Sequence, residues 1–434
     1  MAEVKANRSE CGQQDVKNVF LTATEQGDAE QVRKLLEEHS IEPDLTAMRE
    51  GIGRSVLSVA ATYGQTSIIS ELLKGGANPV LKSGSQRVAL HEACIGGHLE
   101  SVRLLVDATS DINVGDINGQ TAAHLAAFHG ETKVLKLLLD KGANMTATDN
   151  KGRQPAHLSA TRNHKPILQL LFKCGVDLDS QCNAGKTPLH YAAQYGSYEA
   201  LVYLIERNSD LTVRDVHLNL PLHHAARHDK LRCLQFLIKH GTSVNITQAE
   251  GRASSHIAAL SGSVNVLHWL LDTDADANLV DNHGNTPLHY AAEGGKAESF
   301  NCCLQHDASL SAVNKRGDTP LDAAKKYGHR LLMEKALKNE VVCPLCLKKC
   351  EKLEYERKHA PALVERSITS VSMTAYTSPL PAFQRTSTQH QKNLLKANMK
   401  KKAIKQNLRL GRDLAAKYFG DHLDSDGSFQ FTTK

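Results

Sequence analysis

Three cysteines in the last quarter of the chain have a spacing that suits a metal ion. Cys343 and Cys346 are separated by two residues, as in a zinc knuckle, and Cys350 follows one helical turn later. His359 would complete a tetrahedral set of three cysteines and one histidine. The residues leave two alternatives open, a segment of ordinary reduced cysteines and an ion shared in a dimer. The sequence therefore predicts a candidate zinc site at Cys343, Cys346, Cys350 and His359.

Histidine recurs at a single fixed interval through most of the chain. Each member of the series follows the last by 33 residues: His91, His124, His157, His190, His223, His256 and His289. Packed helices lie about 8 to 10 Å apart, so one ion would not bridge histidines of successive repeats. We therefore expect each imidazole to hydrogen-bond nearby hydroxyl and backbone groups and to tie one repeat to the next.

A short helix is expected to hold each of these histidines. In residues 185–196, Thr187 is a helix N-cap and Pro188 suits the first helical position, while Gly196 ends the helix. A second helix with an apolar stripe is expected over residues 197–207. Isolated helices shorter than about 12 residues are marginal in water, so stacking of repeats must stabilise them. Asn163 replaces the helix-ending glycine in one repeat and Asp229 in another, and we expect local softness there.

The 33-residue period, with Thr-Pro-Leu-His at residues 187–190 and 286–289, resembles the ankyrin repeat. The resemblance implies an all-α solenoid of paired antiparallel helices joined by β-hairpin-like loops. We expect about ten repeats over residues 17–337, a cap repeat and nine units anchored at 58, 91, 124, 157, 190, 223, 256, 289 and 322. The flanking segments expected are a disordered N-terminus (1–16), a Cys-rich segment (338–360), a Ser/Thr-rich linker (361–391), a basic amphipathic helix (392–419) and a disordered C-terminus (420–434).

The resemblance also implies where a partner would bind. In ankyrin repeats, the residues just before the helix-ending glycine face a concave groove together with the hairpin tips. The side chains at these helix positions are Tyr63, Phe128, His129, Arg162, Tyr195, Arg227 and His228. Tyrosine and arginine often dominate binding energy at interfaces. The alternative is that some of these side chains only cover neighbouring repeats.

Ankyrin repeats are often substrates of an asparaginyl hydroxylase, which implies candidate modification sites. Asn113 has the matching upstream Leu105 and the pair Asp111-Ile112. Asn245 and Asn278 match the same pattern less closely. This chemistry would make the protein a substrate and not a catalyst.

Composition and charge limit the location and the ligands of the protein. No apolar run approaches 18 residues and the N-terminal residues lack an apolar signal-peptide core, so we expect a cytoplasmic or nuclear protein with reduced cysteines. Residues 338–434 hold 18 Lys or Arg against 9 Asp or Glu, a charge of +9 within a total of +5. The array is therefore slightly acidic, which argues against binding of nucleic acid by the array. The basic stretch 392–419 is of the kind that binds a calmodulin-like groove, an anionic membrane or nucleic acid. The alternative is a solvated, partly helical tail.

Two functional hypotheses remain. No paired carboxylates, nucleophile motif or phosphate-binding glycine loop stands out, so we do not expect an enzyme, and apart from zinc we expect no cofactor. The first hypothesis is an intracellular scaffold or adaptor that binds a partner protein in the concave groove. The second is a targeting or regulatory subunit of a phosphatase or ubiquitin ligase complex, with a small C-terminal zinc module. The chain loosely resembles the ankyrin-repeat regulatory subunits of phosphatases. A zinc module that recruits a ubiquitin-conjugating enzyme should have a second pair of ligands, which the Cys-rich segment lacks, and this favours the first hypothesis.

Overall fold

The computed structural model describes residues 19–39, 44, 46–47, 53–273, 275–338 and 340–359. These residues are mostly helical and form successive pairs of short helices, which confirms the predicted fold class. The chain divides into two compact units, residues 1–221 and 222–434. No helix in the described ranges is long and apolar enough to span a membrane.

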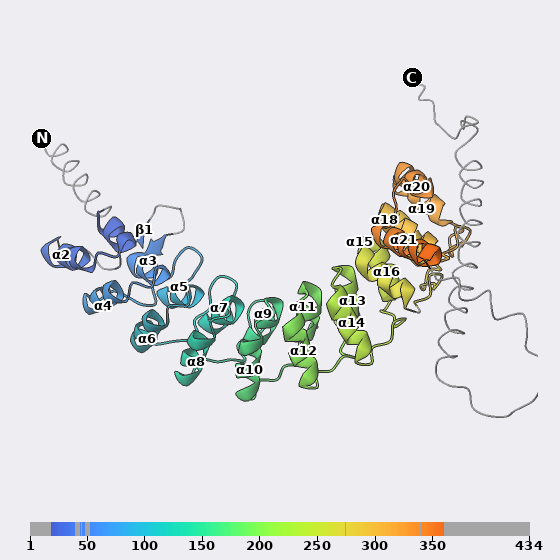
Figure 1. Cartoon of the computed structure of the whole chain (residues 1–434). Coiled ribbons are helices and arrows are strands. Elements are labelled where there is room, and N and C mark those ends of the chain that lie inside the picture. Colours follow the sequence, from blue (N-terminus) through green and yellow to red (C-terminus); the bar gives the residue numbers. More distant parts are fainter. Residues whose placement is uncertain are drawn as a thin grey trace, which may run out of the picture. The chain divides into compact units, whose positions relative to one another are not determined.

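The first unit stacks its helices in two rows, with α3, α5, α7, α9 and α11 in one row and their partners in the other (Figure 1). A helical segment at residues 19–26 precedes the first labelled helix. The helices are α2 (Ala29–His39), α3 (Val56–Thr62), α4 (Thr66–Lys74), α5 (Ala89–Ile95), α6 (Leu99–Ala108), α7 (Ala122–His129), α8 (Thr132–Asp140), α9 (Pro155–Thr161), α10 (Lys165–Lys173), α11 (Pro188–Tyr195) and α12 (Tyr198–Glu206). Between α2 and α3, strands β1 (Thr46–Ala47) and β2 (Arg54–Ser55) pair antiparallel.

The second unit begins within α13 and continues the same pairing. Its helices are α13 (Pro221–Arg227), α14 (Leu231–Lys239), α15 (Ser254–Ser261), α16 (Val264–Asp272), α17 (Pro287–Glu293), α18 (Ala297–Gln305), α19 (Pro320–Lys326), α20 (Arg330–Leu337) and α21 (Pro344–His359). The last of these, α21, follows the helix pairs and packs against α16. Figure 1 shows it beside α16 and α18 (orange).

Alanine and leucine fill the interior because they let neighbouring helices approach closely. Leu189, Ala192 and Ala193 of α11 are fully buried, and so are Leu201 and Leu204 of the following helix. No long side chain separates the first helices of adjacent repeats at these positions. The repeats therefore stabilise one another by burying apolar surface that each would expose alone.

The regularly spaced histidines are structural, as the sequence predicted. In His124, Nδ1 accepts a hydrogen bond from the Thr121 N–H (3.2 Å), so Nε2 carries the proton and donates it to the Arg153 carbonyl (2.8 Å). Nε2 of each of the seven histidines contacts a carbonyl 23 or 29 residues further along the chain. Burial lowers the pKa of His91, His157 and His256 to about 4, so these imidazoles stay neutral near pH 7.

Asn163 and Asp229 end their helices in the left-handed conformation that glycine adopts elsewhere, with φ of 63° and 54°. Each side chain also bonds the second helix of the next repeat. Asn163 Oδ1 accepts the Ala200 N–H and Asp229 Oδ1 accepts the Val266 N–H, both at 2.9 Å. These two hydrogen bonds offset the loss of glycine. The sequence-based expectation of local softness at Asn163 and Asp229 did not take them into account.

The loops between repeats are linked through their tips. The Ile117 N–H donates to the Ser85 carbonyl (3.0 Å), and the Val216 N–H donates to the Ala184 carbonyl (3.1 Å). In the second unit the Lys315 N–H donates to a carbonyl of the preceding tip in the same way. Backbone hydrogen bonds of this kind therefore link neighbouring tips within each unit.

Candidate functional site

The side chains predicted to bind a partner lie at the ends of the first helices. Tyr63 and Tyr195 are 58% and 51% exposed. His129 and Arg162 in the first unit are also exposed, and so are Arg227 and His228 in the second. Phe128 is half-buried. Six of the seven predicted side chains are therefore accessible to a partner.

Phe128 supports its neighbours. The Arg162 guanidinium lies over its ring at 4.4 Å from the centroid, close enough for a cation–π interaction, and the His129 ring meets it edge-on at 5.3 Å. Burial lowers the pKa of His129, and the charges of Arg162 and Arg87 lower it further. The ends of α7 and α9 thus present an aromatic ring under a fixed cation.

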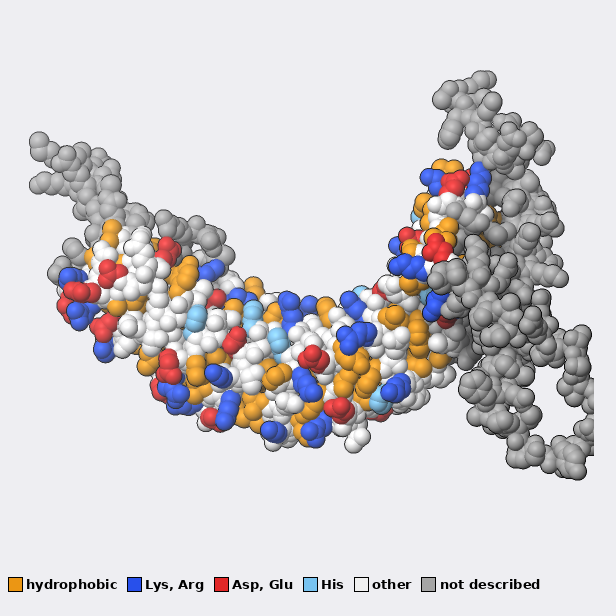
Figure 2. Space-filling view, viewed as in Figure 1, with side chains coloured by type: hydrophobic (Ala, Val, Ile, Leu, Met, Phe, Trp, Pro, Cys, Tyr) orange, Lys and Arg blue, Asp and Glu red, His pale blue; other side chains and the backbone are white. Residues whose placement is uncertain are grey.

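The loop tips add exposed aliphatic side chains that sequence reasoning did not name individually. Ile117, Val216 and Leu218 of the first unit are 45% to 60% exposed, and Val280 and Val313 of the second are 56% and 58% exposed. These residues could have been found in the sequence as apolar side chains within otherwise polar turns. Figure 2 shows hydrophobic side chains interspersed with Lys and Arg over the viewed face.

All three candidate hydroxylation sites are exposed residues of the inter-repeat loops. Asn113 Oδ1 accepts the N–H of Asn144 (2.8 Å), and Asn278 Oδ1 accepts the N–H of Ser309 (2.8 Å). Both side chains therefore link their loop to the next one. Hydroxylation stays a prediction at Asn113, Asn245 and Asn278.

The structure brings only part of the predicted metal set together. Cys343 and Cys346 are buried, whereas Cys350 is exposed. The side chain of His359 lies outside the described residues. Cys346 instead meets His268, Cys302 and His306, and the four potential ligand atoms all lie within 4.8 Å of one another. Three donors near Cys346 thus come from the array itself, and the sequence predicted none of them.

These four side chains, the His/Cys cluster, come from three helices. His268 lies on α16 and Cys302 on α18, His306 follows the end of α18, and Cys346 lies in the first turn of α21. Cys302 is fully buried, Cys346 is 5% exposed, and the side chains of His268 and His306 are 13% and 8% exposed. His268 and His306 belong to the second-helix regions of adjacent repeats, where the two side chains come close together. The regularly spaced histidines lie on the first helices, and the expectation that one ion would not bridge successive repeats holds for those histidines alone.

Asp272 lies behind both histidines. Its carboxylate oxygens are 3.9 Å from His268 Nε2 and 3.8 Å from His306 Nδ1, the ring nitrogens that face away from the thiols. Lys349 of α21 donates to the same carboxylate at 2.5 and 2.7 Å. Burial opposes ionisation of Asp272, but Lys349 and then the two histidines lower the pKa of its carboxyl below the usual value.

Cys343 lies beside the cluster and fixes the start of α21. Its N–H donates to Asn301 Oδ1 at 3.1 Å, a buried contact with α18. Hydrogen bonds with the Cys302 and Cys346 thiols lower the pKa of the Cys343 thiol. Cys303, adjacent in sequence, is fully buried, and burial raises the pKa of its thiol to about 12. Neighbouring cysteines thus have very different surroundings.

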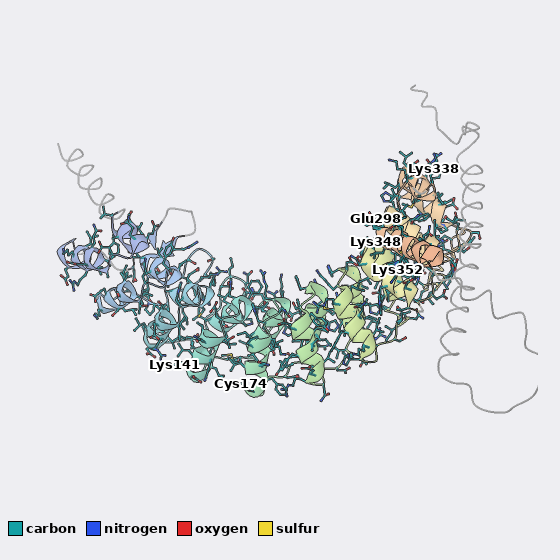
Figure 3. The ribbon with its side chains drawn as sticks, in the orientation of Figure 1. Lys141, Cys174, Glu298, Lys338, Lys348 and Lys352 are labelled. Atoms are coloured by element: carbon teal, nitrogen blue, oxygen red, sulfur yellow. The ribbon has the colours of Figure 1, made fainter. Side chains whose placement is uncertain are left out.

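A break in the repeat pattern could have revealed Cys302 and His306. The position of Cys302 holds large apolar residues in the preceding repeats, namely Leu104, Leu137, Leu170, Tyr203, Phe236 and Trp269. The position of His306 holds Lys141 and Cys174 at the ends of α8 and α10, where Figure 3 labels both side chains. The histidine alone is no signal, because His240 occupies the same position in its repeat, but a cysteine stands at the position of Cys302 in none of the six preceding repeats.

The predicted basic helix at residues 392–419 lies outside the described residues. Its suggested contacts with a calmodulin-like groove or an anionic membrane therefore stay predictions. The predicted linker and both predicted disordered ends also lie outside the described ranges.

Comparison with known proteins identifies the repeat. The ankyrin repeat domain of human ASB11 is similar over 51% of this chain and 99% of that chain, with 26% sequence identity and a TM-score of 0.47. The family model "Ankyrin repeats (3 copies)" matches residues 57–149, 145–215, 215–281 and 255–342. Because these matches together span more than half of the sequence, the chain belongs to the ankyrin-repeat family.

Proposed function

We propose that this protein is an intracellular scaffold or adaptor that binds a partner protein through the exposed ends of its first helices and the neighbouring loop tips. The observation that carries the proposal is the exposure of Tyr63 and Tyr195 together with the Arg162 guanidinium held over Phe128. Tyrosine and arginine are typical anchors of interfaces, and here they are exposed at the ends of the first helices of several repeats.

Location inside the cell is part of the same proposal. Nine cysteines in the described part of the chain are free thiols, which suits a reducing compartment. We further propose a binding role without catalysis, because repeats of this kind act through extended surfaces and catalysis normally needs an enclosed pocket.

The alternative, a targeting subunit with a separate zinc module, receives less support. Such a module would carry its own ligands within residues 343–359. Cys346 instead lies among residues of α16 and α18, and Cys350 is exposed. This arrangement favours a role inside the array over recruitment of an enzyme by a free-standing module.

The test compares capture of partners from cell lysate by the tagged full chain and its variants, quantified by mass spectrometry. We expect Tyr195→Ala and Arg162→Ala each to lower the captured amount of a specific partner about tenfold, as for residues that dominate an interface. Phe172→Ala is the matched control, because Phe172 is an exposed aromatic (40%) on the second helix α10. Equal loss with Phe172→Ala, or no loss with either test variant, would contradict the proposal.

A further inference from the structure

We propose that His268, Cys302, His306 and Cys346 bind one structural zinc ion that fastens α21 to the last repeats of the array. The inference concerns the second unit alone and stands whether or not the exposed surface binds a partner. The donor atoms are His268 Nδ1, His306 Nε2 and the two Sγ atoms. On zinc binding, the two thiols lose their protons, and both imidazoles bind as neutral ligands.

The distances between the donor atoms match a tetrahedral site. With Zn–S of about 2.3 Å and Zn–N of about 2.0 Å, ligand atoms lie about 3.8 Å apart (S to S), 3.5 Å (S to N) and 3.3 Å (N to N). The Sγ atoms of Cys302 and Cys346 are 3.8 Å apart, and the two histidine nitrogens are 3.5 Å apart. Three sulfur-to-nitrogen distances are 3.3, 3.9 and 4.0 Å. The four atoms thus surround a space of the size of one zinc ion.

The groups behind the ligands are those that a zinc site requires. Asp272 faces the outer ring nitrogens of both histidines, so one carboxylate can orient both imidazoles toward the ion. Lys349 holds that carboxylate in place from α21. Both the ligands and their support therefore connect α16, α18 and α21.

The composition and burial of the cluster favour a structural zinc ion. Two imidazoles and two thiolates in a tetrahedral arrangement suit zinc and not magnesium or calcium, which prefer oxygen ligands. Four protein ligands fill the coordination shell and leave no position for a substrate. Cys302 and Cys346 are buried, so the ion would lie inside the packing of the second unit.

The role of the ion follows from the place of α21. Helix α21 follows α20 in the sequence but packs against α16, and the Cys343 N–H at its start bonds Asn301 of α18. Cys346 lies in the first turn of α21, and Lys349 lies one turn further on. A zinc ion at Cys346 would hold that first turn against α16 and α18.

The experiment measures metal content of the purified full chain from zinc-supplemented cells by elemental analysis and native mass spectrometry. We expect about one zinc per chain, which His306→Ala or Cys346→Ser lowers to about a tenth or less. Matched controls are His240→Ala, at the position in its repeat that His306 occupies, and Cys350→Ser, one turn beyond Cys346 on α21. Both His240 and Cys350 are exposed, so both controls should keep the ion.

A second readout reports on α21 without any variant. Lys348 and Lys352 are exposed on α21 (Figure 3), whereas Lys141 is exposed in the first unit. We expect a zinc chelator to accelerate trypsin cleavage at Lys348 and Lys352 at least about tenfold, because cleavage needs local unfolding, and to leave cleavage at Lys141 unchanged.

Specific results would overturn the assignment. A wild-type chain that binds no zinc when zinc is supplied, or that contains a Cys302–Cys346 disulfide instead, excludes the site. Loss of zinc in Cys343→Ser with retention in His306→Ala would show that the ion uses a different donor set. A cobalt-substituted wild type without the visible bands of tetrahedral cobalt–thiolate coordination would also contradict the proposal, even if the ligand variants fail to fold.

Discussion

The chain contains two kinds of histidine, and the sequence alone predicted the role of only one kind. The regularly spaced histidines repeat every 33 residues, and such strict periodicity indicates a structural task, which their hydrogen bonds confirm. His268 and His306 belong to no such series, although His240 shares the position of His306 in its repeat, and their convergence depends on the approach of α16, α18 and α21. A site built from one position on each of several helices leaves no compact motif in the sequence.

The buried histidines make stability depend on pH. The pKa of His157 falls from 6.5 in the unfolded chain to about 4 in the folded protein, so below pH 6.5 the unfolded state binds a proton that the folded state does not. Stability from the neutral imidazole is therefore complete above pH 6.5 and is lost as the pH falls toward 4. We expect the difference in free energy of unfolding between wild type and His157→Ala to shrink by about 2 kcal/mol between pH 7.5 and 5.

Urea unfolding followed by circular dichroism measures this difference. His240→Ala is the control, because His240 is exposed at the end of α14. Its difference from wild type should stay constant over the same range. A gap for His157→Ala that is independent of pH, or that widens in acid, would show that burial of the imidazole has no such effect.

At the scale of elements, the pairing of helices was predictable because short-range signals set it. Proline stands at the first helical position of α9, α11, α13, α17 and α19, glycine ends most of the first helices, and the second helices carry an apolar stripe. These short-range signals did not show how the protein compensates for the loss of glycine at two helix ends. Asn163 and Asp229 bond the next repeat, a contact that depends on three-dimensional stacking. The docking of α21 was missed for the same reason.

Replacement of Asn163 tests this compensation. Asn163→Ala removes the bond to the Ala200 N–H and places alanine, which tolerates the left-handed region less well than asparagine, at a φ of 63°, so we expect a loss of about 2 kcal/mol in free energy of unfolding. Asn163→Gly removes the bond but also the strained β-carbon, and should lose about 1 kcal/mol or less. Both values come from urea unfolding. If the two variants lose equal stability, backbone strain does not matter at this position.

At the scale of the whole molecule, the family and the fold could be predicted, whereas the partner could not. The core of each repeat is fixed by alanine and leucine that are shared among repeats. The exposed residues, such as Tyr63, Tyr195 and Ile117, differ from repeat to repeat, and their meaning lies in the complementary surface of another protein. The proposed zinc ion would fix α21, the last described helix of the second unit, to α16 and α18.

The central claim is that the array and not the basic C-terminal segment binds the partner. The most direct measurement compares partner capture by the full chain, by residues 1–360, which keep Cys346 and α21, and by residues 361–434. The account predicts that residues 1–360 capture the same partner as the full chain, in an amount that Tyr195→Ala lowers about tenfold, and that residues 361–434 capture none of it. Capture by residues 361–434 at the level of the full chain would contradict the account.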